Sequence, residues 1–581
     1  MPYGPILKPP LSSFAVRPNL ADYDEERQSF SWDAVSRELP WFDAEHINIA
    51  HVAIDAHLGT PREHKLAMIW ESKTGETEEY TFADLARLSN RFANALTGVL
   101  DARPGDRVFF FLDRIPETYV GIIGALKAGC VIGPLFAAFG PDAVRDRLQD
   151  SEARVLVTSP ALLRKVESIL RELPALEKIV LVDRDGEGDT APGGIAWEQL
   201  MAGASDHFEV ARTHREDLAI MHYTSGTTGK SKGAVHVHNA IVGHYGTAKL
   251  VLDLRDDDVY WCTADPGWVT GTSYGIFGPW SNGVTQAIYE GGFSSSHWYS
   301  FIERHKVTVW YTAPTAIRML MKSGEELPRK YDLGSLRHTC SVGEPLNPEA
   351  VVWGQEVLGL PFHDNWWQTE TGAMMIANYA VQEIRPGSMG RPFPGITAGI
   401  IDDHGNEVAP GVEGDLALRP GWPSMFRAYW KKQALYDKCF RNGWYISGDR
   451  ASMDADGFFW FVGRADDVIN TAGHLVGPFE VESVLIEHPA VSEAGVIGKP
   501  DELAMEVIKA FVSLKDGYEP SEELRRNIHR FVKKRLSTAA SPREIEFIDS
   551  LPKTRSGKIM RRLLKARELG LPLGDTSTLE D

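Results

Sequence analysis

A glycine- and hydroxyl-rich stretch at 223–233, Tyr-Thr-Ser-Gly-Thr-Thr-Gly-Lys-Ser-Lys-Gly, constrains this chain more than any other feature. The apolar runs on either side, at 218–223 and 234–238, have the composition of strands. Glycine permits a tight turn and the close approach of a ligand, and free backbone N–H groups in such a turn form a concavity for anions. Hydroxyls and two lysines add donors and positive charge, so the stretch predicts a cradle for a triphosphate.

The stretch is not a Walker phosphate loop. That pattern requires a glycine five residues before its Gly-Lys pair, and position 224 is Thr. The ordinary P-loop NTPase interpretation therefore loses its main support. Taken alone, the stretch could also be a flexible Gly/Ser/Thr loop without a ligand.

Length, charge and cysteine usage narrow the class of protein. The 581 residues are enough for two or more domains, and a net charge of −19 argues against a general nucleic-acid binder. No run reaches the roughly 18 apolar residues of a membrane span, and the N-terminus lacks the build of a signal peptide. Four widely spaced cysteines form no metal motif and suit reduced thiols in a cytoplasmic protein.

After about residue 80 the chain alternates helix-type and strand-type segments. We expect a helix from Thr81 to about residue 100, because Thr81 is a good N-cap and Asp84 lies in the first turn. Continuous apolar strands separated by helices are typical of a parallel α/β sheet. The expected segments are strands at 107–112, 154–158 and 178–183, and a helix at 118–129.

Beyond about residue 390 the pattern changes to short strands and turns. A hairpin at 399–407 and a strand ending at Asp449 indicate a β-rich subdomain that closes the large one. A compact α+β module then runs to the end of the chain. The predicted fold class is α/β, with parallel sheets and a β-rich subdomain in an N-terminal domain (1–465) and a small α+β C-terminal domain (466–581).

Three further motifs accompany the loop, in Trp-Cys-Thr-Ala-Asp-Pro-Gly-Trp at 261–268, Gln-Thr-Glu-Thr-Gly at 368–372 and Thr-Arg-Ser-Gly-Lys at 554–558. With the phosphate loop, they resemble the AMP-forming acetyl-CoA synthetases of the adenylate-forming superfamily. The resemblance runs from about residue 30 to the end, in the family's order. It implies that acetate and Mg·ATP give acetyl-AMP and pyrophosphate, and that coenzyme A then takes the acetyl group and releases AMP.

The resemblance assigns most of the nucleotide site. Asp449 is expected to accept the ribose hydroxyls, because a carboxylate can accept both, and Arg464 to contact the nucleotide. Glu370 is the expected Mg²⁺ ligand, since Mg²⁺ prefers oxygen ligands. The remaining expected ATP/AMP ligands are Thr224, Ser225, Gly226, Thr227, Thr228, Gly229, Lys232, Gly343, Glu344, Pro345, Asp364, Asn365, Trp366, Gln368, Thr369 and Asn470.

Lys558 is the expected adenylation catalyst, because a mobile ammonium stabilises the negative charge that builds up at the α-phosphate. By resemblance the terminal domain rotates about Asp466 between the two half-reactions. Lys558 would also be a target for a lysine acetyltransferase and deacetylase. The acyl pocket is expected from Val269, Thr270, Val342 and Trp367, and coenzyme A contacts from Arg145, Arg147, Gly473 and Lys533.

The indole of Trp367 at the pocket floor predicts a very short acyl group. Two departures from the family's pattern stand out, namely Leu475 in place of an arginine and Thr272 where the family often has His. We therefore expect a cytoplasmic acetyl-CoA synthetase, monomeric or homodimeric, with small-molecule partners and neither nucleic acid nor membrane. The alternatives are a propionyl- or other short-chain acyl-CoA synthetase, an adenylation domain that loads a carrier protein, and a non-catalytic nucleotide-binding regulator.

Overall fold

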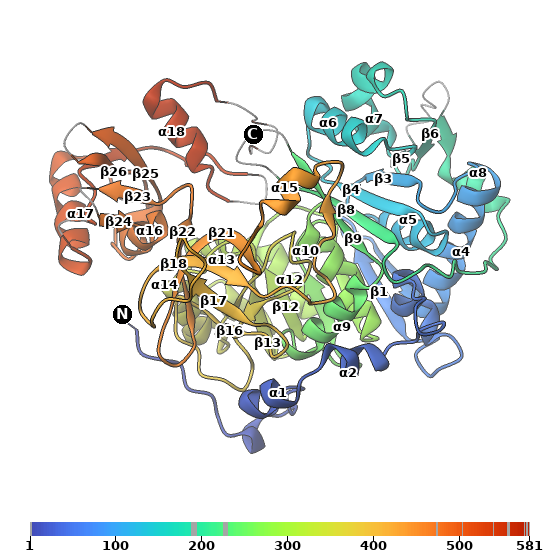
Figure 1. The fold of residues 1–581 in the computed structure, drawn as a ribbon, viewed down its shortest axis with the longest axis horizontal. Helices are drawn as coiled ribbons and strands as arrows, with labels where there is room; N and C mark the ends of the chain where they lie inside the picture. The colour runs from blue at the N-terminus through green and yellow to red at the C-terminus, as the bar shows by residue number, and fades with distance from the viewer. Residues whose placement is uncertain are drawn as a thin grey trace.

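Three β-sheets with their covering helices make up the structure, a computed structural model (Figure 1). It describes residues 3–186, 194–224, 231–471, 474–501, 504–537, 540–554, 558–573, 576 and 579. The first two sheets form one large body, and the third belongs to a small module beside it, at the end where β21 and β22 lie. Among the described residues, no helix combines the length and apolar character needed to cross a bilayer.

The first sheet has eight strands in the order β19-β9-β8-β4-β3-β5-β6-β7. Its strands from β8 to β7 pair in parallel, whereas β8 and β9 form an antiparallel hairpin and β19 pairs antiparallel with β9. The bounds are β3 Arg107–Phe111, β4 Val131–Leu135, β5 Val155–Thr158, β6 Lys178–Leu181, β7 Gly194–Ala196, β8 Leu218–Thr224, β9 Lys232–Val237 and β19 Ala428–Tyr429. The strands predicted on both sides of the phosphate loop are therefore confirmed.

The helices around this sheet include the one predicted from Thr81. The Thr81 hydroxyl accepts the Asp84 N–H and the Asp84 carboxylate accepts the Thr81 N–H, which is the reciprocal capping box that starts α4. The helices are α4 Phe82–Gly98, α5 Pro116–Lys127, α6 Pro141–Ser151, α7 Pro160–Val166, η3 Glu167–Glu172, α8 Trp197–Ala202 and α9 Ala240–Leu250.

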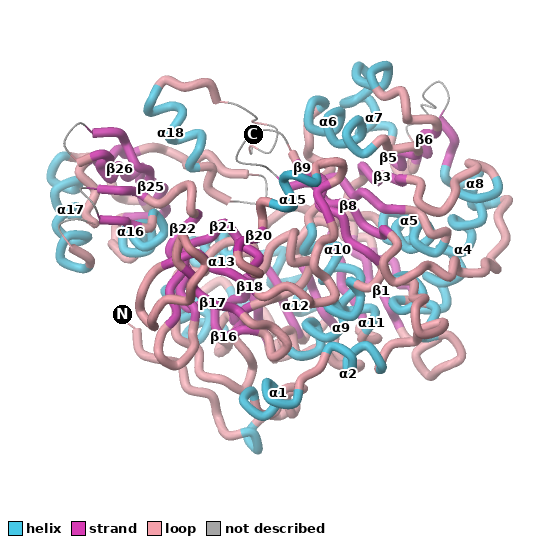
Figure 2. Tube along the Cα trace, viewed as in Figure 1, coloured by secondary structure: helices cyan, strands magenta, loops and turns pink. Residues whose placement is uncertain are grey.

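The second sheet follows the path β17-β18-β21-β22-β16-β15-β14-β13-β12-β10-β11-β1-β2, with β20 paired to β21. Strands β14, β13, β12, β10, β11 and β1 are parallel neighbours, while the strands from β15 to β17 pair antiparallel. The predicted β-rich subdomain thus continues the edge of a parallel sheet (Figure 2).

The strand bounds in this sheet are β1 Leu66–Glu71, β2 Thr77–Thr81, β10 Val259–Cys262, β11 Thr285–Tyr289, β12 Val309–Thr312, β13 His338–Ser341, β14 His363–Trp366, β15 Ile376–Ala377, β16 Ser388–Pro392, β17 Ala398–Ile401, β18 Gly414–Leu418, β20 Phe440–Arg441, β21 Trp444–Met453 and β22 Phe459–Arg464. The associated helices are α10 Val269–Thr272, η4 Ser273–Phe277, α11 Gly278–Ser281, α12 Ser295–His305, α13 Pro314–Lys322, η5 Pro328–Lys330, α14 Pro348–Trp353, η6 Gly354–Leu358 and α15 Gln433–Asp437.

The chain changes sheet between β22 and β23 Ile469–Thr471, and the expected domain boundary at 465/466 falls in this connection. The third sheet has the order β24-β23-β26-β25, with β27 beside β26. The remaining elements of the module are β24 His474–Val476, β25 Val491–Asp501, β26 Met505–Leu514, β27 Glu544–Phe547, α16 Pro478–Ile486, α17 Glu522–Arg535 and α18 Arg561–Leu569. Its core is a separate apolar cluster that includes Val481, Leu485 and Val512.

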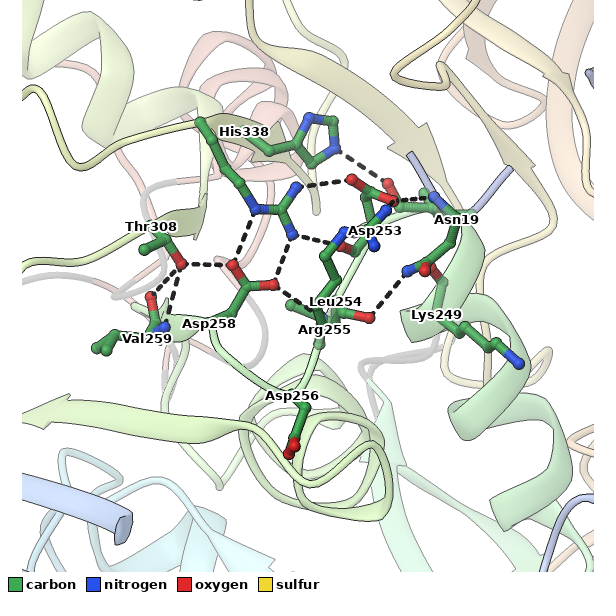
Figure 3. A network of polar contacts seen from close by, with 12 residues as sticks. Asn19, Lys249, Asp253, Leu254, Arg255, Asp256, Asp258, Val259, Thr308 and His338 are labelled. Atoms are coloured by element: carbon green, nitrogen blue, oxygen red, sulfur yellow. Dashed lines mark hydrogen bonds and ion pairs between the residues drawn. The ribbon is translucent and has the colours of Figure 1, made fainter. Parts of the chain in front are cut away.

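The N-terminal segment lies along the large body and is fastened to it by polar contacts. The backbone N–H of Asn19 donates to Asp253 Oδ1, and its side chain donates to the carbonyls of Lys249 in α9 and of Leu254 beyond it (Figure 3). Asp253 in turn binds Arg337, which also holds Asp258. The short helices in this segment are η1 Leu11–Ser13, α1 Tyr23–Ser29, α2 Trp32–Arg37, α3 Ile49–Ala53 and η2 Asp55–His57.

Candidate active site

One cavity of about 2300 Å³ collects most of the residues singled out in the sequence. It lies among the loops after β8, β10, β12, β13 and β14, and the terminal module contributes part of its lining. The predicted residues that line it are Arg147, Thr224, Lys232, Val269, Thr270, Val342, Gly343, Glu344, Pro345, Asp364, Asn365, Trp366, Trp367, Gln368, Thr369, Glu370, Asp449, Arg464, Asp466 and Lys558.

The phosphate loop joins two antiparallel strands, in which Thr224 of β8 is paired with Lys232 of β9. A Walker loop instead leads into the N-terminus of a helix. The predicted ligands Ser225, Gly226, Thr227, Thr228 and Gly229 lie outside the described residues. Thr224 and Lys232, at the two ends of the loop, both face the cavity.

Asp449 is the centre of a polar cluster on one side of the cavity. Its Oδ2 accepts the Trp366 indole N–H at 2.9 Å and the Gln368 amide at 3.0 Å, and its Oδ1 lies 3.0 Å from Arg464 Nη1. Burial raises the pKa of the Asp449 carboxyl, while Arg464, the Trp366 hydrogen bond and the nearby charge of Lys558 act in the opposite direction. A carboxylate, a guanidinium and an aromatic edge are therefore preorganised beside one another.

The prediction that a strand ends at Asp449 is wrong, because β21 continues to Met453. Gly448 has φ +74°, in the region that glycine adopts readily, and the pairing with β22 shifts in register just after Asp449. The register shift, between Arg450 and Ala451, therefore lies within a longer strand, one residue beyond the expected ribose ligand Asp449.

Glu370 is held by Tyr429 of β19. The Tyr429 hydroxyl donates to Glu370 Oε1 at 2.7 Å, and the ammonium of Lys232 lies 5.4 Å from the centre of the same ring. Within the described residues, Oε2 has no hydrogen-bond partner and Glu370 lines the cavity. One free carboxylate oxygen in a polar cleft fits Mg²⁺, which usually takes one or two carboxylates together with substrate phosphates.

The expected acyl pocket is built on an interrupted helix. Val269 and Thr270 begin α10, which passes through the π-helical turn η4 into α11. Such turns occur often at functional sites. A Cβ on Gly271 would lie 2.0 Å from the Asp265 carbonyl oxygen, so only glycine allows this approach. Thr272 receives a contact that sequence reasoning missed, since its hydroxyl lies 2.7 Å from Nε2 of the buried His222.

Val342 and Trp367 complete that pocket, and both are buried at its edge. The Trp367 ring meets Tyr274 edge-on, with centroids 5.1 Å apart at 84°, and its indole N–H donates to Tyr311 at 3.3 Å. The indole is therefore fixed from two sides.

The expected adenine wall contains two carboxyls in different surroundings. Glu344 is paired with Arg318 at 2.8 Å and accepts the Thr315 hydroxyl. Asp364 is buried, and the loss of water raises the pKa of its carboxyl to about 8, although the Ser341 hydroxyl donates to it. Asp364 can thus donate a proton in a hydrogen bond, whereas Glu344 is engaged by Arg318 and Thr315.

Lys558 enters the cavity from the terminal module. Its backbone N–H donates to Thr554 Oγ1 and its carbonyl accepts the Thr554 N–H at 2.7 Å, which closes a short hairpin. The side chain is exposed and lines the cavity. Burial raises the pKa of Asp467, as it does that of Asp449, and the nearby charge of Lys558 acts in the opposite direction on both. In this arrangement the ammonium therefore faces the expected nucleotide site.

Several predicted residues are not brought to the cavity. Arg145 is engaged by Asp142 and Asp146, and Lys533 is exposed on α17. Asn470 lies on β23, where its N–H donates to Glu506. Among the described coenzyme A candidates only Arg147 lines the cavity, stacked on Phe139 at 4.3 Å; Gly473 lies outside the described residues.

Four residues at the site carried no signal in the sequence: Tyr311, Arg318, Tyr429 and His222. Asp265 belongs to the motif at 261–268, which predicted no role for it. It lines the cavity, and burial raises the pKa of its carboxyl to about 6. Tyr311 lies in β12 and Arg318 in α13, the helix that follows it, and only this position at the carboxyl end of a parallel strand could have marked them.

Comparisons with known proteins cover nearly the whole chain. The family profile described as AMP-binding enzyme matches residues 56–430, and that of the AMP-binding enzyme C-terminal domain matches residues 480–558. An acetyl-coenzyme A synthetase of Bacillus subtilis (strain 168) is 50% identical over 564 residues, covering 97% of this chain and 98% of the relative. One from Pyrobaculum arsenaticum is 41% identical over 610 residues, covering 96% and 91%.

Solved structures agree with these relatives. A Brucella canis acyl-CoA synthetase superposes with a TM-score of 0.74 at 38% identity, covering 94% of this chain and 99% of the other. An anthranilate CoA ligase in complex with anthranoyl-AMP superposes with a TM-score of 0.83 at 31% identity, covering 92% and 99%.

Proposed function

Because this chain belongs to the AMP-binding enzyme family, we propose that it activates acetate with ATP and transfers the acetyl group to coenzyme A. Its relatives make it an AMP-forming acid–thiol ligase, an acetyl-CoA synthetase. The observation that carries the proposal is the convergence of four separated motifs, at 223–233, 261–274, 341–372 and 554–558, on one cavity.

In the first half-reaction, an acetate oxygen attacks the α-phosphate and pyrophosphate leaves. We assign Asp449 to the ribose hydroxyls and Arg464 to the nucleotide, because both face the cavity and hold each other in place. Thr224, Lys232 and the loop between them would take the phosphates. Lys558 would stabilise the charge that develops on the bridging oxygens.

Mg²⁺ would be held by Glu370, and when bound it neutralises phosphate charge during transfer. The hydroxyl of Tyr429 leaves only Oε2 of Glu370 without a partner among the described residues, which fits a single bond to the cation. Tyr429 also lies against Lys232, so the same ring would set the position of a phosphate-binding ammonium.

Acetate is the substrate that the pocket supports best. Val269, Thr270, Val342 and Trp367 all line the cavity, and Trp367 cannot turn away without losing its contacts to Tyr274 and Tyr311. Each added methylene gains roughly 0.8 kcal/mol when buried, but forcing it against a filled wall typically costs about 1–3 kcal/mol. Chains beyond propionate are therefore expected to be poor substrates.

In the second half-reaction, the thiol of coenzyme A attacks the acyl carbonyl and AMP leaves. We propose that residues 466–581 rotate as a domain about Asp466 and replace Lys558 with the coenzyme A path. The backbone supports a pivot there: among the described residues, Ala465 and Asp467 donate main-chain hydrogen bonds whereas Asp466 donates none. Among the described cations predicted to bind coenzyme A, Arg147 lines the cavity, which supports assigning it to a coenzyme A phosphate.

An assay of AMP release with acetate and ATP, with and without coenzyme A, tests this function. We expect AMP release to require both acetate and coenzyme A, and acetate-dependent ATP–pyrophosphate exchange to occur without coenzyme A. Exchange without coenzyme A-dependent AMP release would indicate a carrier-loading domain, and the absence of both would indicate a nucleotide-binding regulator. A panel of short acids separates acetate from propionate.

We also propose that Lys558 is a site of reversible acetylation. Its side chain is exposed, and acetylation removes the charge assigned to adenylation. Chemically acetylated Lys558 should lose ATP–pyrophosphate exchange and regain it after deacetylation. Unchanged exchange with full acetylation, measured by mass spectrometry, would contradict the role.

A further inference from the structure

The hydroxyl of Tyr311 lies beneath the cavity, between the acyl pocket and the nucleotide site. Tyr311 is on β12, a central strand of the second sheet, and is fully buried. Its strand pairs with β10 on one side and β13 on the other, so the backbone cannot shift without disturbing the sheet. The ring is thus a rigid element, and only the direction of its O–H bond is adjustable.

Two hydrogen bonds meet at this hydroxyl. The Trp367 indole N–H, which can only donate, lies 3.3 Å from the Tyr311 oxygen. The Tyr311 O–H then donates to Asn365 Oδ1 at 2.8 Å. One hydroxyl therefore connects the expected floor of the acyl pocket with a residue expected to face the adenine.

Within the described residues, neither the Trp367 side chain nor the Asn365 side chain has a second polar partner. The Trp367 indole has one polar atom, and Tyr274 contacts the ring through its edge. The Asn365 amide nitrogen is buried without a hydrogen-bond partner among those residues, while the side chain lines the cavity. Without the Tyr311 hydroxyl, both side chains would lose the contact that fixes their rotation.

The phenol is held in its neutral form. Burial raises the pKa of Tyr311 far above its ordinary value, and the neighbouring Cys262, Cys340 and Tyr274 supply no cation that would reverse this. The proton needed for the bond to Asn365 is therefore retained at every pH at which the protein is used.

We propose that Tyr311 is a positioning residue that sets Trp367 and Asn365 relative to each other, so that acyl-length selection and nucleotide binding depend on one hydroxyl. The inference rests on the proposed function, because it assigns Trp367 to the acyl group and Asn365 to the nucleotide. Tyr311 itself is not required to touch either substrate.

The test compares Tyr311→Phe with Tyr379→Phe in the full-length enzyme, using pyrophosphate release with acetate and propionate. Tyr311→Phe keeps the ring and removes only the hydroxyl. We expect the propionate-to-acetate ratio of kcat/KM to rise about 10-fold, the scale of one methylene of discrimination, and the KM for ATP to rise several-fold. Tyr379 is also fully buried, and its hydroxyl donates to the Pro392 carbonyl at 3.2 Å away from the cavity lining.

Tyr379→Phe should leave both quantities at the parent value. A lower melting temperature in both variants with an unchanged acid ratio in Tyr311→Phe would mean a purely structural hydroxyl and would overturn the proposal. A parent enzyme without acetate-dependent pyrophosphate release would instead overturn the proposed function, so the two failures are distinguishable.

A double variant tests whether Tyr311 acts through Trp367. Trp367→Phe removes the indole N–H, so adding Tyr311→Phe should change the acid ratio by less than twofold further, while still raising the KM for ATP through Asn365. Fully multiplicative effects on the acid ratio would show that Tyr311 does not act through Trp367. If Tyr311→Phe does not fold, Trp367→Phe alone must raise the ratio, and an unchanged ratio would overturn the proposal.

Discussion

Two arginine–aspartate clusters in the large body use the same chemistry in different ways. Arg337 lies 2.6 Å from Asp253 and 2.5 Å from Asp258, two carboxylates that are only 3% exposed, and its ion pairs lie within one network (Figure 3). Arg464 lies 3.0 Å from Asp449 through Nη1 but 3.6 Å from Asp466, and a third of its side chain is exposed to the cavity.

The difference shows that the type of charge pair does not identify a functional site. At Arg337 each carboxylate is bound and faces neighbouring protein, so the pairs join loops of the fold. At Arg464 the donors are only partly used and point into a cavity that a ligand can enter. We therefore expect substitutions at the first cluster to lower stability and substitutions around the second to lower activity.

The largest expected effect comes from breaking the Arg337 cluster. Arg337→Met should lower the free energy of unfolding by about 3–5 kcal/mol, because it removes the cation that pairs with both buried carboxylates and leaves Asp253 only Arg255, at 3.7 Å. Urea unfolding measures the loss, and the KM for ATP of the folded variant should equal that of the parent. A raised KM for ATP at unchanged stability would contradict the expectation that the Arg337 cluster acts on stability and not on activity.

The stability lost in Arg337→Met should also depend on pH. Burial already raises the pKa of Asp253, and loss of Arg337 raises it further. A carboxyl whose folded pKa lies above its unfolded value loses stability as pH rises between the two, so the deficit should grow from about pH 4 upward. In Arg337→Met/Asp253→Asn that growth should be smaller.

Lys558→Ala tests the Arg464 cluster by removing the ammonium that the terminal module brings to it. ATP–pyrophosphate exchange should fall by about 10²–10³-fold, the scale of losing one group that stabilises developing charge. Thioester formation from supplied acetyl-AMP should persist, as should the melting temperature. Lys534→Ala on the exposed face of α17 is the matched control. Equal loss of both half-reactions would contradict the assignment to adenylation.

Asp466→Pro tests whether the terminal module must rotate away from the Arg464 cluster during turnover. Proline fixes φ without removing a main-chain hydrogen bond seen among the described residues. We expect adenylation to persist and overall acetyl-CoA formation to fall by about 10²-fold, the scale of a misplaced reacting group. Asp466→Ala, which keeps the backbone free, separates the hinge from the carboxylate. Overall turnover at the parent rate in the proline variant would exclude Asp466 as the pivot.

The smallest expected effect is on acyl length. In the parent, butyrate should be roughly 10-fold or more poorer than acetate in kcat/KM, with propionate between them. Trp367→Gly should reverse the order in favour of four- to six-carbon acids and raise the KM for acetate. An unchanged acid preference would place the pocket floor at another residue, and a parent that prefers butyrate would overturn the acetyl assignment.

Local patterns allowed much of the fold to be predicted. The capping box at Thr81 and the strands around the phosphate loop are confirmed, because each depends on residues close in sequence. The end of the strand at Asp449 was misplaced, because a bulge beside Gly448 lets β21 continue through a turn-like sequence. That outcome depends on pairing with β22, which no local pattern contains.

The site was predicted mainly through resemblance, and its supporting residues were missed. Tyr311 contacts Asn365 from 54 positions away, and Tyr429 contacts Glu370 from 59 positions away. Tyr311 and Asn365 meet because β12, β13 and β14 are parallel neighbours, whereas Tyr429 lies on β19, which pairs antiparallel with β9 of the other sheet. Arg145 shows the reverse case, since acidic neighbours on its own helix engage a cation that the motif alone could not distinguish from a ligand.

The antiparallel hairpin that carries the phosphate loop has a consequence for product release. A helix N-terminus would hold phosphate with a permanent partial charge of about half a unit, and this loop joins two strands instead. On the proposed function, Mg²⁺ and the ammonium of Lys558, which can both depart, would add to the attraction of the fixed ammonium of Lys232. The retention time of pyrophosphate is therefore expected to be set by how long the terminal module stays in place.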